Sequence, residues 1–136
     1  MLTRKLDCEA SVETLWALVA RPEQWSRWSP YVRGADGLGS PEVRAGARGE
    51  VILAGGLRLP ARILEVDPGR SWSWQVGGLV VDHVVEKTAG GSKLSMPVRP
   101  ARGLWKPAAL AYAPLVSLIG RRIVNLAESD EPLSLS

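Results

Sequence analysis

The chain has 136 residues, enough for one domain and too few for two separate hydrophobic cores. Its 46% hydrophobic and 23% charged residues are typical of an ordinary soluble protein, and no signal-peptide pattern precedes the first element, so we expect a cytoplasmic location. One cysteine and one histidine exclude an internal disulfide and a zinc-type ligand set, and a net charge of +3 without a basic run argues against nucleic-acid binding.

Motifs for cofactor chemistry are missing as well. The sequence has no P-loop, no dinucleotide-binding fingerprint and no nucleophile elbow, so we expect neither a cofactor nor a metal. Nothing in the sequence fixes the oligomeric state.

The N-terminal part predicts a strand and two short helices. Residues 2–9 alternate between apolar and polar side chains, as in a half-buried strand. Ser11 stands at the N-cap position of a short helix that ends before Pro22. A helical turn then places Trp25 and Trp28 on one side, where we expect them to close one end of the core rather than contact a ligand.

The middle of the chain predicts a meander of antiparallel strands. A strand over 32–35 and a mobile loop to Gly49 come first, and two glycine pairs then each predict a two-residue hairpin turn. The first pair, Gly55-Gly56, places Ile52 opposite Leu59.

The second pair, Gly77-Gly78, places Trp72 opposite His83 and Trp74 opposite Val81. A tight turn at 67–70 lets Val66 pair with Ser71, which sets Ile63 beside Trp74 and Glu65 beside Trp72. The loop 88–92 sets His83 beside Met96. The inner face of the sheet is therefore expected to carry one row made of Glu65, Trp72, His83 and Met96.

The segment 104–128 predicts one long amphipathic helix, with Tyr112, Leu115 and Leu118 on its apolar side. Charged and proline residues interrupt its apolar run, so we expect no transmembrane segment. Such a helix needs a large apolar surface, which predicts an α+β fold with a curved antiparallel sheet around it. We expect one domain over 1–128 and a flexible tail over 129–136.

Four segments together resemble polyketide cyclase/dehydrase-like proteins of the START-like (SRPBCC, Bet v 1-like) superfamily. They are WALVA at 16–20, PEQWSRWSP at 22–30, EVDPGRSW at 65–72 and GGSKL at 90–94, in this order around His83 and before the last helix. The resemblance implies a helix-grip fold: a seven-stranded antiparallel sheet around a long C-terminal helix, two short helices after the first strand, and a hydrophobic cavity between. One departure is Pro97, near which we expect the last strand to break.

The resemblance and the inner row together suggest binding of a hydrophobic small molecule, such as a lipid or polyketide, in an internal cavity. The expected ligand-binding residues are Ile63, Glu65, Trp72, Trp74, His83, Met96, Tyr112 and Leu115. An alternative is a cyclase/dehydrase-type enzyme in which His83 is the acid or base, Glu65 tunes it and Trp72 stacks on the substrate. A third hypothesis is docking of the last helix, with Arg121 and Arg122, on a membrane surface or a partner.

Overall fold

The computed structural model describes residues 5–29, 31–76, 78–100 and 106–130, and for residues 100 and 106–117 only the backbone. The helical elements are α1 (Val12–Ala20), the 3₁₀ turn η1 (Pro22–Gln24), α2 (Trp25–Trp28), the 3₁₀ turn η2 (Ala54–Gly56) and α3 (Lys106–Asp130). The strands are β1 (Lys5–Cys8), β2 (Val32–Asp36), β3 (Arg48–Leu53), β4 (Arg58–Asp67), β5 (Ser71–Val76), β6 (Leu79–Thr88), β7 (Gly91–Ser95) and β8 (Val98–Pro100).

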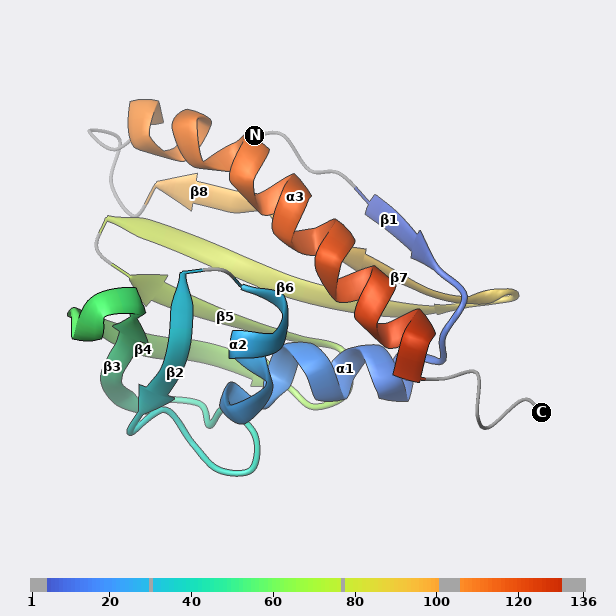
Figure 1. The fold of residues 1–136 in the computed structure, drawn as a ribbon, viewed down its shortest axis with the longest axis horizontal. Helices are drawn as coiled ribbons and strands as arrows, with labels where there is room; N and C mark the ends of the chain where they lie inside the picture. Colours follow the sequence, from blue (N-terminus) through green and yellow to red (C-terminus); the bar gives the residue numbers. More distant parts are fainter. Residues whose placement is uncertain (1–4, 30, 77, 101–105, 131–136) are drawn as a thin grey trace.

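Within these residues the strands form one antiparallel sheet in the order β1-β7-β6-β5-β4-β3-β2, and β8 also pairs with β6 (Figure 1). β7 and β8 are two parts of one strand that breaks at Pro97, as predicted, because proline has no N–H for the ladder. The carbonyl of Pro97 still accepts a hydrogen bond from the backbone N–H of Asp82 at 3.0 Å. The expected helix-grip fold is confirmed.

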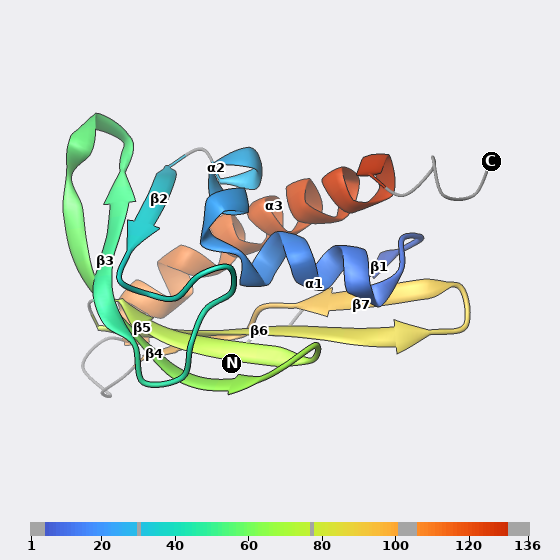
Figure 2. The same ribbon diagram turned by 90° about the horizontal axis from the view of Figure 1, so that it is seen from below.

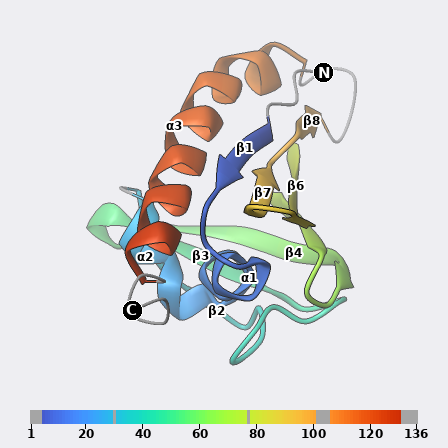
Figure 3. The ribbon, with the colours of Figure 1, turned by 90° about the vertical axis from the view of Figure 1, so that its right-hand side faces the viewer.

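All three α-helices lie on one side of the sheet, and β2 and the β3–β4 hairpin curl toward them (Figure 2). Seen from the end, α3 and strands β4 and β6 lie on opposite sides of the interior, with α1 at one end (Figure 3). The described side chains of α3 that are buried are Ile119, Ile123, Val124 and Ala127. Leu118, expected on the apolar side, is 60% exposed, so that expectation was wrong.

Helix α1 forms as its sequence predicts, and tryptophan side chains hydrogen-bond to carbonyls at its C-terminal end. Ser11 caps the first turn, with its Oγ accepting a hydrogen bond from the N–H of Thr14 at 3.3 Å. The last carbonyls of any helix lack partners within the helix. Here the indole N–H of Trp28 donates to Leu18 O at 2.9 Å, and the indole N–H of Trp25 donates to Val19 O at 2.9 Å.

The β5–β6 register is as predicted, with Trp72 opposite His83 and Trp74 opposite Val81. The β3–β4 register is shifted by one residue, because η2 is a three-residue turn in which Gly55 and Gly56 have φ of 87° and 85°. Ile52 therefore lies opposite Arg58 instead of Leu59.

Helix α3 continues to Asp130, two residues beyond the expected end of the domain at Glu128. The carboxylate of Asp130 holds the guanidinium of Arg27 through two contacts of 3.1 Å, which tie the end of α3 to α2. The rest of the expected tail, 131–136, lies outside the described residues.

Candidate functional site

A small pocket lies between the sheet, α2 and α3, with a volume of about 40 Å³. Its walls come from six elements or their immediate flanks, and their side chains are mostly apolar and aromatic. The lining residues are Trp25, Trp28, Ser29, Val32, Trp72, Trp74, Val81, His83, Met96 and Ile119.

Four aromatic rings form one packed cluster on this wall. Trp72 is stacked between Trp25, at a centroid distance of 5.5 Å and 9°, and His83, at 3.8 Å and 6°. Trp74 meets all three rings edge-on, at centroid distances from 5.1 to 6.0 Å. Stacked and edge-to-face pairs of this kind add to the energy of burial, so displacing one ring costs its contacts with the others.

The indole N–H of Trp72 also has a backbone partner. It donates to Val19 O at 3.1 Å, the same carbonyl that accepts from Trp25. A strand of the sheet and the segment after α1 are thus joined through a single carbonyl at the end of α1. This contact fixes the position of the aromatic cluster against the helical layer.

His83 is neutral at ordinary pH. Its side chain is 3% exposed, and burial lowers its pKa to about 3, against the opposing effect of a hydrogen bond with Trp72 O. The distance from Nδ1 to that carbonyl is 3.3 Å, and a carbonyl only accepts, so Nδ1 carries the proton. The Nε2 atom then carries a lone pair, and among the described residues no side chain or backbone group hydrogen-bonds to it.

The structure brings together four of the predicted site residues, namely Trp72, Trp74, His83 and Met96. Ile63 is buried opposite Trp74, as predicted, but does not line the pocket. The side chains of Tyr112 and Leu115 lie outside the described part of the chain.

The prediction for Glu65 was wrong. A bulge between Ile63 and Glu65 shifts the β4–β5 register, so Val66 lies opposite Trp72 and Glu65 lies opposite Ser73. Because neighbouring strand residues point to opposite faces, the Glu65 side chain is exposed on the outer face of the sheet. It cannot orient or tune His83.

Sequence reasoning missed six lining residues: Trp25, Trp28, Ser29, Val32, Val81 and Ile119. The tryptophans close the end of the core, as predicted, but also contact the pocket. Val81 was within reach of sequence reasoning, because it shares the inner face with His83 in the predicted hairpin. Ser29 carries no sequence pattern that marks it, and its Oγ accepts hydrogen bonds from the N–H groups of Tyr31 and Val32 at 3.4 and 3.2 Å.

The pocket holds little more than a water molecule, since one water occupies about 30 Å³ of liquid. Sites for drug-sized ligands have volumes of roughly 300–1,000 Å³. Within the described residues no three histidine, cysteine or acidic side chains gather where they would hold a metal ion. Among the helices that the structure describes, none is long and apolar enough to cross a membrane.

The fold and the aromatic interior define a protein of the START-like, Bet v 1-like class. The sequence model of one family in this class, described as "Polyketide cyclase / dehydrase and lipid transport", matches residues 2–127. The chain belongs to this family. No sequence match is found among curated proteins.

Solved structures agree on the fold at low sequence identity. Protein MLL2253 from Mesorhizobium loti superposes with a TM-score of 0.77 and 17% identity, over 94% of this chain and 96% of that one. Protein SSP2350 from Staphylococcus saprophyticus gives a TM-score of 0.71 and 13% identity, over 93% and 91%. Ara h 8.0201 superposes with a TM-score of 0.69 and 13% identity, over 94% of this chain and 97% of that one. At these identities the likeness concerns the fold alone.

Proposed function

We propose that this protein binds a hydrophobic small molecule, such as a lipid or a polyketide, against the aromatic wall between the sheet and α3. The observation that carries the proposal is the gathering of Trp25, Trp28, Trp72 and Trp74 around one pocket. Large aromatic surfaces with few polar groups are typical of small-molecule sites. The family description, which includes lipid transport, supports the same class of ligand.

The volume of about 40 Å³ requires the pocket to enlarge when a ligand enters. Met96 is the lining residue best suited to move, because its unbranched side chain has several low-energy rotamers, whereas the stacked rings are fixed by neighbours. Ligand entry is therefore expected to displace Met96 before it displaces Trp72.

We place binding ahead of catalysis because of the state of His83. A pKa of about 3 makes its imidazole a weak base and leaves almost no imidazolium to act as an acid at neutral pH. Its Nδ1 is occupied by Trp72 O, and Glu65 lies on the opposite face of the sheet. The lone pair on Nε2 instead suits a hydrogen bond from a ligand hydroxyl.

Two measurements test the proposal. Mass spectrometry of an organic extract of the protein purified from its native host, against a mock purification, identifies any ligand that co-purifies. Quenching of tryptophan fluorescence by the apolar dye 1-anilinonaphthalene-8-sulfonate then locates the site. Met96→Phe, which fills the pocket with a rigid ring, should weaken saturable quenching about tenfold, a loss of roughly 1.4 kcal/mol.

Leu118→Phe is the matched control, because Leu118 is exposed on α3, and it should leave the quenching unchanged. Equal affinities for the wild-type protein and Met96→Phe would contradict binding at this pocket. An empty extract combined with no saturable quenching would overturn the proposed function.

A second candidate function has one observation in its favour. Leu118, Arg121, Arg122 and Asn125 recur at helical spacing and all are exposed, so α3 presents an apolar and basic outer face. Such a face suits docking on an anionic membrane surface. Co-sedimentation with phosphatidylserine vesicles at low salt tests it, and the double variant Arg121→Gln, Arg122→Gln should abolish sedimentation. Failure of the wild-type protein to sediment would reject this candidate.

A further inference from the structure

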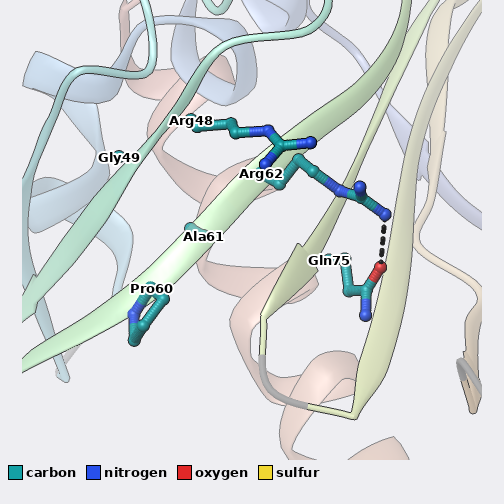
Figure 4. Close-up of a pocket in the computed structure, with 6 residues that line it drawn as sticks. All are labelled: Arg48, Gly49, Pro60, Ala61, Arg62 and Gln75. Atoms are coloured by element: carbon teal, nitrogen blue, oxygen red, sulfur yellow. Dashed lines mark hydrogen bonds between the residues drawn. The ribbon is translucent and has the colours of Figure 1, made fainter.

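The outer face of the sheet, turned away from the helices, carries an open groove of about 480 Å³ (Figure 4). Strands β3, β4 and β5 form it, and it lies on the opposite side of the sheet from the aromatic pocket. Its lining residues are Arg48, Gly49, Pro60, Ala61, Arg62 and Gln75. Its volume falls within the range of roughly 300–1,000 Å³ that small-molecule sites occupy.

Two arginines face each other in this groove. Arg48 on β3 is the direct partner of Arg62 on β4, and both side chains are exposed. Both point outward, because Ala61 and Ile63, which flank Arg62, are buried on the inner face. Figure 4 shows the two side chains next to each other, extending in the direction of β5. Like charges directly opposite each other destabilise a strand pair unless something neutralises them.

Nothing described in the structure neutralises this pair. No carboxylate of the described residues forms an ion pair with Arg48 or Arg62. Arg58, on the same strand and face as Arg62, shows the contrast: its Nη1 lies 3.2 Å from Glu50 Oε1 and 3.4 Å from Asp36 Oδ2. Hydrogen bonds to Glu50 and then Asp36 raise the pKa of the Arg58 guanidinium.

The nearby acidic side chains on this face are therefore already engaged or displaced. The carboxylates of Glu50 and Asp36 both form ion pairs with the guanidinium of Arg58. Glu65 lies opposite Ser73, past the bulge, and forms no ion pair with Arg62 among the described contacts.

Gln75 holds one of the two guanidinium groups in place. Its Oε1 accepts a hydrogen bond from Arg62 Nη2 at 3.0 Å, while its own amide hydrogens remain as donors. Pro60, exposed beside the pair, adds an apolar wall to the groove. The groove thus combines two positive charges, one of which Gln75 holds in place, with an additional donor and an apolar edge.

We propose that this groove binds a small organic phosphate monoester. Two guanidinium groups match the charge of a phosphate monoester, about −1.5 to −2 at neutral pH, whereas a carboxylate would neutralise only one of them. Planar guanidinium groups also bind phosphate oxygens in a bidentate way. The organic part of the ligand then lies against Pro60.

The test is a titration of the ¹⁵N-labelled protein with phenyl phosphate at low ionic strength, followed by backbone and arginine Nε–Hε resonances. Saturable shifts are expected at Gly49, Ala61, Arg62 and Gln75, with a dissociation constant on the order of 1 mM. Arg48→Gln and Arg62→Gln should each weaken binding at least about tenfold, which corresponds to 1.4 kcal/mol. Arg58→Gln, the matched control, should weaken it less than about twofold.

Three results would overturn the proposal: no saturable shift in the wild-type protein, an equal loss in Arg58→Gln, or equal affinity for the monoanion phenyl sulfate. Inorganic phosphate that binds as tightly as phenyl phosphate would overturn the assignment to an organic monoester. Because all three arginines are exposed, the variants are expected to fold, and thermal melting checks this. The wild-type titration decides the question even if one variant does not fold.

Discussion

The two faces of the central sheet offer opposite kinds of site. The inner face carries a small pocket of about 40 Å³ whose one ionisable side chain is neutral, and the outer face carries an open groove of about 480 Å³ with two unneutralised charges. Adjacent residues serve different sites, since Trp74 faces the pocket and Gln75 the groove. Because neighbouring residues of a strand point to opposite faces, a single sheet carries an apolar pocket on one side and a positively charged groove on the other.

The largest expected effect is on the stability of the inner face. Trp72 is 2% exposed and is stacked on both sides, so Trp72→Ala should lower the free energy of unfolding by about 3–5 kcal/mol, measured by urea denaturation. Gln75→Ala, a truncation in the groove on the outer face, should change the free energy of unfolding by less than about 0.5 kcal/mol. Similar losses in both variants would contradict the difference between the faces.

Lowering the pH should also reduce the free energy of unfolding through His83, which lies on the inner face. Its folded-state pKa of about 3 lies below the ordinary value of 6.5, so the unfolded chain takes up the proton first. The stability that neutral, buried His83 contributes to the folded state is complete above the unfolded pKa. It is lost as the pH falls from about 6.5 toward 3. Between pH 7 and pH 5 the loss should be about 2 kcal/mol.

This pH effect is measured as the difference between the wild-type protein and His83→Gln in urea denaturation at the two pH values. The subtraction removes the contribution of the carboxylates, which titrate in both proteins. An unchanged pH dependence in the variant would show that His83 has an ordinary pKa in the folded state.

A smaller effect is expected from a charge reversal in the groove. Arg48→Glu replaces a like-charge pair with an opposite-charge pair across β3 and β4, so stability should rise by about 0.2–1 kcal/mol. Thermal melting at low salt measures it, and the gain should shrink in high salt because the charges are exposed. A loss of stability would mean that Arg48 and Arg62 do not repel each other in solution.

The smallest effect is expected at Glu65, where the sequence had suggested a role in the pocket. Because Glu65 is exposed on the outer face, Glu65→Gln should change stability by less than about 0.5 kcal/mol and leave dye quenching unaltered. A clear loss of quenching would mean that the Glu65 side chain faces the pocket, which would contradict the β4 bulge.

Hairpin registers could be predicted only in part, because a glycine pair does not determine the length of its turn. The Gly77-Gly78 pair in the sequence predicted the correct β5–β6 register, with Trp72 opposite His83. The turn at Gly55-Gly56 failed, because two glycines fit a two-residue and a three-residue turn equally well.

The error of one residue in the predicted β3–β4 register concealed the arginine pair of the groove. The expected register would have set Arg48 opposite Ile63, whereas the observed register sets it opposite Arg62. The bulge before Glu65 has no side-chain pattern of its own, since it depends on how the strands twist around the interior. The indole hydrogen bonds to Leu18 and Val19 depend on tertiary packing and leave no trace in local sequence.

The stack of Trp25 on Trp72 gives the protein an optical signature. Two indoles held nearly parallel at 5.5 Å, with Trp74 edge-on to both, are close enough for their electronic transitions to couple, and we expect an exciton couplet in circular dichroism. Trp25 belongs to the helical layer and Trp72 to the sheet, so the couplet exists only while the two layers are docked. Its disappearance on heating, ahead of the backbone signal or together with it, would show whether the layers separate before the sheet unfolds.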